Sequence, residues 1–325
     1  MKAWFRLLPG CETTMKDFQS SNNVMITGAT GFIGAHLCTS LVQKGYEVFG
    51  LSHCGNIQKI SALLKTSNFH LLSGNILDHD SICRLVQENN ITAIFHLAAR
   101  LPHDDDVTNP RLSFEINAWG TLNLLLAASL NKVKNFIYGS SIDVYSEPPQ
   151  HLPVNEKHPT RPCKAYGISK LEGELYSMLY ANTIQVTVLR YAIVFGQWCK
   201  ASSAVNCFIR QALFAEPLLI HGDGAQSGDF VYVKDVVKAN LLALEKNISG
   251  IYNIGSGEET SVKELARIVI QLTKSNSEVI FTGMDSNRPY RFALDINRAQ
   301  KVLGYRPSPL RQGLSDYIKH TDCRQ

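Results

Sequence analysis

Short apolar runs alternate with longer amphipathic stretches along most of the chain. The first run, Asn23 to Thr27, leads into glycines, and the stretch from Phe32 to Lys44 places apolar side chains at helical spacing before Gly45. A short apolar run bounded by turn residues is typical of a buried strand, so this segment predicts strand, turn and helix. The alternation continues with further predicted strands at 47–51, 69–72, 93–97, 136–139 and 186–189.

Repeated strand and helix units predict an α/β fold, in which parallel strands form a doubly wound sheet covered by helices on both faces. After Tyr191 the alternation loosens and loop signals become more frequent, which predicts a smaller C-terminal α/β lobe. We expect a poorly ordered leader at residues 1–22, a first domain at 23–190 and a second lobe at 191–325. Part of that lobe, at about 230–250, is expected to return to the first domain.

Composition and charge exclude several classes of protein. Of 325 residues, 45% are hydrophobic and 18% are charged, and the net charge of +4 is scattered, so no basic surface for nucleic acid is indicated. No apolar stretch reaches the roughly 18 residues of a membrane helix. Because Arg6, Pro9 and Glu12 interrupt the N-terminal apolar patch, a signal peptide is not indicated. We therefore expect a cytoplasmic protein that binds neither membranes nor nucleic acid.

The cysteines indicate no metal site. The eight cysteines are spread through the chain and include no C-x-x-C pair. Cysteines scattered in this way through a large chain argue against both a disulfide framework and a zinc site, so free thiols are expected.

A glycine-rich turn follows the first predicted strand. The sequence TGATGFIG places Gly28, Gly31 and Gly34 in a G-x-x-G-x-x-G pattern. Glycines let the backbone turn tightly and approach a pyrophosphate, whose charge is then stabilised by N–H groups at the N-terminus of the following helix. A plain glycine-rich turn is the alternative. Because strand, glycines and helix follow in the required order, residues 23–190 are predicted to form a Rossmann dinucleotide-binding domain.

The choice between NAD and NADP depends on the end of the second predicted strand. A free 2′-hydroxyl usually meets an Asp or Glu there, about 20 residues past the turn, whereas a 2′-phosphate needs hydrogen-bond donors or positive charge. The segment GLSHCG contains no acid, and Ser52 and His53 can donate to a phosphate. The NAD(P) prediction therefore leans towards NADP. Asn75 and Ile76 are candidates to pack beside adenine, although an Asn after a strand also shapes turns.

A second constellation contains residues able to move protons. Tyr166 and Lys170 are four residues apart, on one face of a predicted helix. An ammonium near a phenol lowers the phenol pKa from about 10, so that the tyrosine can exchange a proton near neutral pH. This spacing also occurs by chance on surface helices. Upstream, Ser140 and Ser141 follow an apolar strand, at the end that faces a cofactor crevice.

These ordered motifs resemble the extended short-chain dehydrogenases/reductases, specifically the NAD(P)-dependent nucleotide-sugar epimerase/dehydratase family. The resemblance runs from about Asn23 to Tyr317. It rests on GATGFIG at 28–34, FHLAA at 95–99, INAWGT at 116–121, SSIDVY at 140–145, YGISK at 166–170, GDG at 222–224, DFVYV at 229–233, YNIGSG at 252–257 and LGYRP at 303–307.

The resemblance implies roles for individual residues. Ser141, Tyr166 and Lys170 would be the catalytic set, and Asn117 would support the hydrogen-bond network of the active site. His96 is expected to be a core residue, as a lone His in an apolar strand usually is. Family members are often dimeric, so a homodimer is expected by analogy. The implied cofactor contacts are Gly28, Thr30, Gly31, Phe32, Ile33, Gly34, Leu97, Ala98, Ala99, Tyr166 and Lys170.

Two departures from the family pattern concern the substrate. Where the family often reads R-x-x-N-V-Y-G-P, with an Asn that contacts the sugar nucleotide, this chain has Ile193. Where the family often reads R-D-F, with an Arg that grips the diphosphate, this chain has Gly228 before Asp229. Arg288 is the candidate for a second phosphate-binding arginine, since arginine can pair with a phosphate through two hydrogen bonds.

The leading hypothesis is an enzyme that transfers hydride between the nicotinamide of NAD(P) and C4 of a nucleotide-linked hexose, as a 4-keto-sugar reductase or a 4-epimerase. Tyr166 would be the general acid or base on the C4 oxygen, Ser141 would hold that oxygen, and Arg288 would bind the substrate phosphate. The alternatives are a dehydrogenase or reductase of a ketone or alcohol without a nucleotide, a nucleotide-sugar 4,6-dehydratase, and a non-catalytic NAD(P)-sensing protein.

Asp143 bears on the dehydratase alternative. It lies two residues after Ser141, where related 4,6-dehydratases generally carry Glu and some related 4-keto-sugar reductases carry Asp. Asp is one methylene shorter than Glu, and the neighbouring Ile142 has no ionisable group. Asp143 is therefore expected to support the site, and we predict ketone reduction or epimerisation without loss of water. An Asp that only shapes the local loop is the other interpretation.

Overall fold

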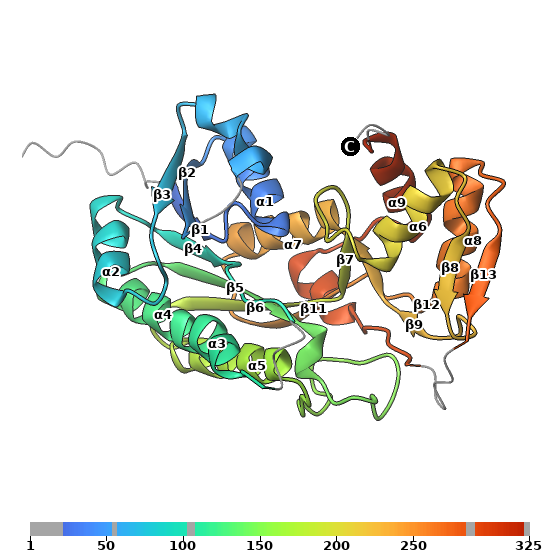
Figure 1. Ribbon diagram of the computed structural model, residues 1–325. Coiled ribbons are helices and arrows are strands. Elements are labelled where there is room, and N and C mark those ends of the chain that lie inside the picture. The colour runs from blue at the N-terminus through green and yellow to red at the C-terminus, as the bar shows by residue number, and fades with distance from the viewer. Residues whose placement is uncertain (1–21, 54–56, 103–107, 284–289, 322–325) are drawn as a thin grey trace, which may run out of the picture.

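The computed structural model describes residues 22–53, 57–102, 108–283 and 290–321 (Figure 1). The leader expected at 1–22 lies, apart from Asn22, outside the described residues.

A seven-stranded, all-parallel sheet forms the centre of the described structure (Figure 1). Chain order and spatial order differ: from β1 the chain builds outward through β2 to β3, then crosses back so that β4 pairs on the other side of β1. The doubly wound parallel sheet is confirmed, and its strand order reverses between β1 and β4, where such folds bind ligands. In spatial order the strands are β3 (Phe69–Ser73), β2 (Glu47–Ser52), β1 (Asn23–Thr27), β4 (Ala93–His96), β5 (Asn135–Ser141), β6 (Gln185–Tyr191) and β11 (Gly250–Ile254).

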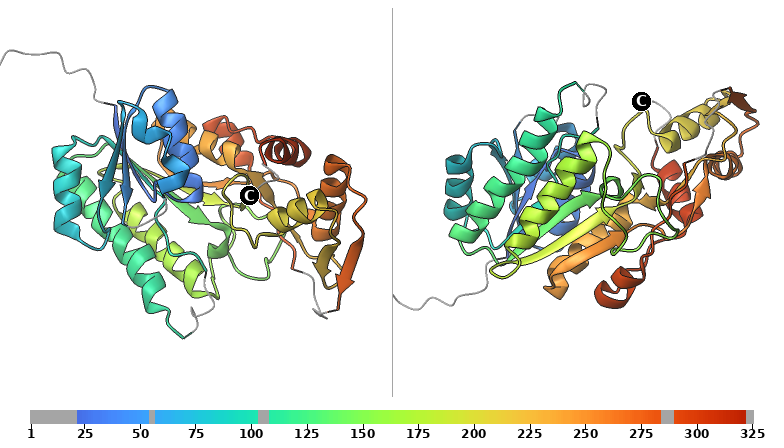
Figure 2. Two further views of the ribbon diagram at one scale, coloured as in Figure 1. Left: turned by 45° about the horizontal axis from the view of Figure 1, so that its top comes forward. Right: turned by 90° about the horizontal axis from the view of Figure 1, so that it is seen from below.

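Helices cover both faces of this sheet because its strands are apolar on both sides. In β1, Val24 and Ile26 pack in the core shared with one helix layer, whereas Met25 packs in the core shared with the other. One layer consists of α1 (Phe32–Gln43) and α7 (Val233–Lys246). The other layer lies in front of the sheet in the right panel of Figure 2 and consists of α2 (His79–Glu88), α4 (Gly120–Leu130) and α5 (Ala165–Leu179).

The helical stretch between β4 and β5 is divided into three segments. It comprises α3 (Arg111–Phe114), a π-helical segment (Glu115–Trp119) and α4. A π segment inserts an extra residue into a helix and often marks a functional site. Here it carries Asn117, which points into the protein and is fully buried. Short 3-10 turns elsewhere in the described Rossmann layer span Ile57–Ile60, Leu63–Lys65 and Ile142–Val144.

A smaller lobe with its own apolar core packs against the carboxyl ends of the strands (Figure 1). Its core side chains come mainly from three helices and from the strands between them. Although α7 and β11 follow this lobe's first elements in the chain, both belong to the central layer. The lobe contains α6 (Ala204–Leu213), α8 (Val262–Thr273), α9 (Leu310–Lys319) and the strand pairs β7 (Ile193–Phe195) with β10 (Phe230–Tyr232), β8 (Leu218–His221) with β13 (Val279–Thr282), and β9 (Ser227–Gly228) with β12 (Thr260–Ser261). A π turn (Ala299–Leu303) packs instead on the central layer, against α7 and β11.

Asp229 joins the smaller lobe to the central sheet. Its fully buried carboxylate accepts hydrogen bonds from Ser256 N at 2.6 Å, Ser256 Oγ at 2.7 Å, Gly257 N at 3.0 Å and Leu294 N at 3.2 Å. A Cβ on Gly255 would lie 2.5 Å from the same carboxylate, so a residue without a side chain is required there. These bonds fix the chain at Asp229 against the residues that follow β11.

The described residues contain neither a candidate membrane span nor a candidate metal centre. No helix among them combines the length and the apolar character needed to cross a membrane. In the same residues, no group of three or more His, Cys, Asp or Glu side chains is arranged to hold a metal ion. The described cysteines, Cys38, Cys83, Cys163, Cys199 and Cys207, are free thiols.

Candidate functional site

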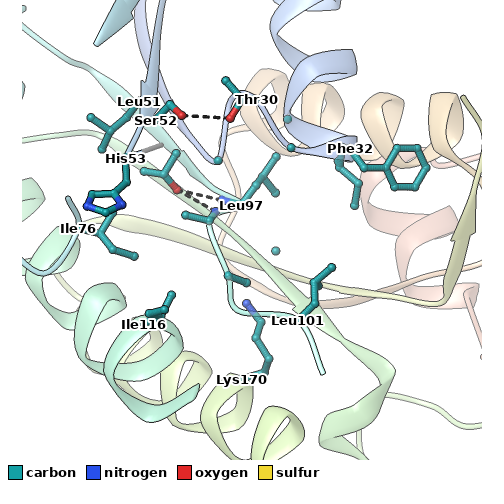
Figure 3. Close-up of a pocket in the computed structure, with 18 of the residues that line it drawn as sticks. Thr30, Phe32, Leu51, Ser52, His53, Ile76, Leu97, Leu101, Ile116 and Lys170 are labelled. Carbon is teal, nitrogen blue, oxygen red and sulfur yellow. Dashed lines mark hydrogen bonds between the residues drawn. The ribbon is translucent and has the colours of Figure 1, made fainter. Parts of the chain in front are cut away.

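A cavity of about 470 Å³ opens at the carboxyl ends of β1, β2 and β4, at the point where the strand order reverses (Figure 3). Its volume is in the range of small-molecule and cofactor sites. All the residues predicted to bind the cofactor line it: Gly28, Thr30, Gly31, Phe32, Ile33, Gly34, Ser52, His53, Asn75, Ile76, Leu97, Ala98, Ala99, Tyr166 and Lys170.

The glycine turn forms the cradle at one end of the cavity. Gly28 has a φ of +71°, and a Cβ at this position would lie only 2.8 Å from Ala98 N. A Cβ on Gly34 would lie 2.1 Å from Gly28 O, so the first turn of α1 packs directly on the glycine turn. Gly31, the residue before α1, has no side chain to cap the first amides of the helix. Those amides are available to a phosphate, so the cradle fits a dinucleotide.

The ribose end of the cavity carries hydroxyl groups. Thr30 Oγ1 and Ser52 Oγ are 3.1 Å apart, and His53 lies beside them (Figure 3). Among the described residues that line the cavity, none is an Asp or Glu. The segment after β2 lacks an acid, and no other described residue of the lining supplies an Asp or Glu in its place.

Asn75 and Ile76, which follow β3, also line the cavity. Asn75 Oδ1 accepts a hydrogen bond from Leu77 N at 3.0 Å, so this side chain shapes its own turn as well as lining the cavity. A Cβ on Gly120 would lie 2.6 Å from Ile76 Cδ1. Ile76 is thus packed tightly against the start of α4.

Lys170 points from α5 into the cavity, opposite Thr30 and Ser52 (Figure 3). Only 2% of this residue is exposed, and its Nζ lies 4.1 Å from the centroid of the Tyr138 ring. Burial lowers the pKa of the Lys170 ammonium to about 7, and the nearby Glu174 carboxylate opposes this shift. Tyr166 precedes Lys170 by one turn of the helix and lines the same cavity.

Ser141 connects Tyr166 to Asp143. Ser141 Oγ donates to Asp143 Oδ2 at 2.7 Å and accepts from Asp143 N at 3.2 Å. Tyr166 is also hydrogen-bonded to Ser141. Ser141 itself is not among the cavity-lining residues, but the preceding Ser140 is.

The expectation of a lowered Tyr166 pKa is wrong for the protein alone. Burial raises the pKa of the Tyr166 hydroxyl, and the negative charge of Asp143 raises it further, while the hydrogen bond to Ser141 opposes both effects. Sequence spacing identifies the neighbouring ammonium of Lys170 but not the desolvation of the site or the carboxylate on its other side.

Asn117 fixes the backbone beside α5. Asn117 Oδ1 accepts from Arg100 N at 2.7 Å, and Asn117 Nδ2 donates to Arg100 O at 2.9 Å. The same Nδ2 is 3.0 Å from Ser169 Oγ, which donates to Tyr166 O at 2.8 Å. Asn117 therefore acts on the site through its neighbours and does not line the cavity.

A buried ion pair supports the strand end that carries Ser140 and Ser141. Arg190 and Glu174 are 3% and 2% exposed, and the guanidinium donates to both carboxylate oxygens at 2.9 and 2.6 Å. Ser140 Oγ also donates to Glu174 at 2.5 Å. The sequence analysis missed this pair. A signal was present, because a charged residue within an apolar strand requires a buried partner.

Several other residues that line the cavity were not predicted from the sequence. Some lie next to the recognised motifs, and others come from segments distant from them in sequence. Gly139 directly precedes the predicted Ser140 and Ser141, whereas Ile116 enters from the π segment. The complete set of missed lining residues is Thr27, Leu51, Gly74, Leu101, Ile116, Gly139 and Tyr191.

The two departures from the family pattern pack against each other. A Cβ on Gly228 would lie 2.6 Å from Ile193 Cδ1, so the isoleucine occupies the space that a side chain at 228 would need. Arg288 lies outside the described residues. Its described neighbour Arg291 is engaged with both carboxylate oxygens of Glu259, at 2.6 and 2.7 Å.

The glycine cradle generates a first prediction. Gly28→Ala should weaken NAD(H) binding about tenfold or more, which corresponds to about 1.4 kcal/mol, because the added methyl group displaces the backbone at Ala98 that lines the cavity. Calorimetric titration with NADH measures this change. Gly45→Ala is the matched control, since Gly45 has a similar φ of +83° but no atom within 4 Å of its ideal Cβ. That variant should lose about 1–2 kcal/mol of stability and retain its affinity. Equal losses of NADH affinity in the two variants would refute the prediction that the glycine turn binds the cofactor.

A family model described as the NAD dependent epimerase/dehydratase family matches residues 24–255. A putative UDP-glucose 4-epimerase from Methanocaldococcus jannaschii is 34% identical over 304 residues, covering 91% of this chain and 97% of the relative. A UDP-N-acetyl-alpha-D-glucosaminuronate decarboxylase from Bacillus cytotoxicus is 31% identical, with 91% and 96% covered. Relatives of similar identity thus carry out different reactions on nucleotide sugars.

Solved structures share the fold. The UDP-glucose 4-epimerase of Thermotoga maritima, solved with UDP-glucose, gives a TM-score of 0.84 at 31% identity and covers 92% of this chain and 98% of its own. The UDP-glucuronic acid 4-epimerase of Bacillus cereus, in complex with UDP-glucuronic acid and NAD, gives 0.79 at 31% identity, with 91% and 99% covered. The NAD in that relative gives no support to a preference for NADP. By its family match and by these relatives, this chain belongs to the NAD-dependent epimerase/dehydratase family of nucleotide-sugar enzymes.

Proposed function

We propose that this protein is an NAD(P)-dependent oxidoreductase that transfers hydride at C4 of a nucleotide-linked hexose, as a 4-keto-sugar reductase or a 4-epimerase. The observation that carries the proposal is the hydrogen-bonded chain from Tyr166 through Ser141 to Asp143, directly beside a cavity lined by Lys170 and the glycine turn. A protein that only senses the cofactor would need the cavity but not this chain of proton-bearing groups.

The residues have distinct roles in the proposed reaction. NAD(P), when bound along the glycine cradle, supplies the donor or acceptor of the hydride. Tyr166 exchanges a proton with the C4 oxygen, and Ser141 holds that oxygen once the substrate oxygen replaces Asp143 as the acceptor of its proton. Lys170 places a positive charge beside the cofactor ribose and Tyr166. Residues 23–190 would hold the cofactor, and residues 191–325 would mainly bind the substrate.

In the protein without cofactor, the electrostatics of the site keep Tyr166 in the protonated state with which ketone reduction begins. Burial and the Asp143 carboxylate raise the pKa of Tyr166, so its hydroxyl is protonated near neutral pH. A protonated tyrosine is prepared to give its proton to the oxygen of a 4-keto group. Epimerisation begins with oxidation of the C4 hydroxyl and would first require Tyr166 to act as a base.

Asp143 is poorly suited to loss of water from the sugar. Dehydration requires removal of the C5 proton and protonation of the departing C6 hydroxyl. The Asp143 carboxylate is already held by Ser141 at 2.7 Å, and the adjacent Ile142 is apolar. These contacts support a role for Asp143 in orienting Ser141.

A second candidate function keeps the oxidoreductase chemistry but changes the substrate. Ile193 and Gly228 pack together where the family often presents an Asn and an Arg, so this part of the lobe offers an apolar surface. A ketone or alcohol without a nucleotide would be compatible with that surface. For the leading proposal, Arg288 is the residue proposed to bind the substrate diphosphate.

Tyr166→Phe tests the proposed chemistry. Turnover should fall by about 100-fold to 10,000-fold, the usual contribution of a general acid or base. The dissociation constant for NAD(H) should change by less than about twofold, because Phe keeps the aromatic ring that lines the cavity. Steady-state assays and cofactor titration measure the two quantities. The control is Tyr176→Phe, which removes a hydroxyl from a more exposed tyrosine on the same helix. Near-normal turnover of the Tyr166 variant would reject the mechanism.

Product analysis distinguishes the candidate reactions. Incubation with NADPH or NADH and a panel of nucleotide hexoses and their 4-keto forms should yield products that are reduced or epimerised at C4, detected by mass spectrometry and NMR. A 4-keto-6-deoxy product that disappears in Asp143→Asn would show that the dehydratase alternative is correct. Turnover of nucleotide-free ketones alone would establish the second candidate.

The cofactor preference can be tested at Ser52. Because no acid lines the ribose end, the wild-type protein should bind NADP(H) at least as tightly as NAD(H). Ser52→Asp should shift the ratio of the two dissociation constants towards NAD(H) by about tenfold or more, through repulsion of the 2′-phosphate. Ser61→Asp, at an exposed serine outside the cavity, should leave the ratio unchanged. A strong wild-type preference for NAD(H) would overturn this expectation.

A further inference from the structure

A chain of buried hydrogen bonds lies below the cavity, between β1 and α4. His96, the last residue of β4, is completely buried, and its two ring nitrogens contact different hydroxyl groups. His96 Nδ1 is 2.7 Å from Thr27 Oγ1, and His96 Nε2 is 2.9 Å from Thr121 Oγ1. Thr27 and Thr121 are equally buried. The expectation that His96 is a core residue describes its burial but not these two specific bonds.

The direction of every hydrogen bond in this chain follows from the bonds made by the Thr27 hydroxyl. Thr27 Oγ1 accepts hydrogen bonds from Leu97 N at 3.2 Å and Ala98 N at 3.1 Å. A hydroxyl oxygen has two lone pairs, so Thr27 must donate its proton to His96 Nδ1. The imidazole proton is therefore on Nε2 and is donated to Thr121, which in turn donates to Asn117 O at 2.6 Å.

The surroundings of His96 oppose a second proton. The Tyr138 ring of β5 lies 5.5 Å from the imidazole, and Lys170 of α5 is the nearby cation. Burial, together with the charge of Lys170, holds the pKa of His96 well below its ordinary value. A proton on Nδ1 would also meet a Thr27 oxygen whose lone pairs are already used. The ring is thus held in one neutral tautomer.

The two ends of the chain lead to the two halves of the site. At one end, Thr27 holds the backbone of Leu97 and Ala98 against the glycine turn, and all three residues line the cavity. At the other end, Thr121 bonds the backbone of Asn117, whose side chain reaches Ser169 on the catalytic helix at 3.0 Å. Neither His96 nor Thr121 lines the cavity, so any effect of these residues on a ligand is indirect.

We propose that His96, neutral and protonated on Nε2, is a positioning residue that holds the cofactor-binding backbone in register with the helix carrying Tyr166 and Lys170. The inference rests on the proposed function in one respect, namely that the cavity takes a dinucleotide. His96 acts indirectly, because it does not contact the reacting atoms. It sets the distance between the backbone at Leu97 and Ala98 on one side of the cavity and α5 on the other side.

The tautomer can be observed directly. Nitrogen-15 NMR of the histidine-labelled full chain, with the His96 signal assigned by its loss in His96→Asn, should show an unprotonated Nδ1 and a protonated Nε2. The signal should not titrate between about pH 5 and about pH 8, where an ordinary histidine changes charge. A proton on Nδ1, or a titration within this range, would overturn the proposal. This result does not depend on any cofactor or activity.

A pair of matched variants tests the positioning role. Thr121→Val removes the acceptor of the Nε2 proton, and Thr187→Val is the control, because both threonines are buried and both donate to a backbone carbonyl. NADH affinity should fall about fivefold in Thr121→Val, the order expected for one lost buried hydrogen bond, and should stay within about twofold in Thr187→Val. Equal affinity in the two variants, after both are shown to be folded, would contradict the role.

A second variant guards against a folding failure of Thr121→Val. His96→Gln keeps an amide nitrogen that can donate to Thr121, so it should retain more NADH affinity than His96→Ala. If His96 only filled space, the NADH affinity of each variant would simply follow the stability of its fold. Gln and Ala variants whose affinities track their melting temperatures would overturn the proposal. If the wild-type protein binds no dinucleotide, the proposed function fails, and the NMR result still decides the tautomer.

Discussion

The close approach of the glycine turn to the chain leaving β4 is the constraint on which the site depends. Gly28 can come so near to Ala98 only because it has no Cβ, and its positive φ turns the chain into α1. The Thr27 hydroxyl then holds the amides of Leu97 and Ala98. This contact closes the floor of the crevice between β1 and β4 while leaving the first amides of α1 open to a phosphate. The cavity is a consequence of that arrangement.

Buried charges determine what the site can do chemically. Arg190 and Glu174 neutralise each other below β5 and hold Ser140, so the strand end is rigid where Ser141 begins. Asp143 places a negative charge near Tyr166, and burial acts in the same direction, so the phenol keeps its proton. In the proposed function, this proton is the one that Tyr166 exchanges with the C4 oxygen. Relatives of several activities share the fold, so likeness to them does not decide between reduction and epimerisation.

Local patterns in the sequence predicted those parts of the site that are formed by neighbouring residues. The glycine turn between strand and helix and the one-turn spacing of Tyr166 and Lys170 follow from short-range geometry, and the alternating apolar runs predicted the parallel sheet. Properties that arise from contacts between distant residues could not be predicted in this way. The raised pKa of Tyr166 depends on burial, and the partners of His96 come from positions 69 residues before it and 25 residues after it.

The central claim is that Tyr166 and its neighbours serve a hydride transfer at C4 of a nucleotide-linked hexose. The most direct measurement supplies the protein with reduced nicotinamide cofactor carrying deuterium at its transferable position, together with a nucleotide 4-keto-hexose. NMR and mass spectrometry of the recovered sugar then locate the label. The account predicts deuterium bonded to C4 of the product. A product that carries hydrogen at C4, or deuterium at another carbon, would contradict it.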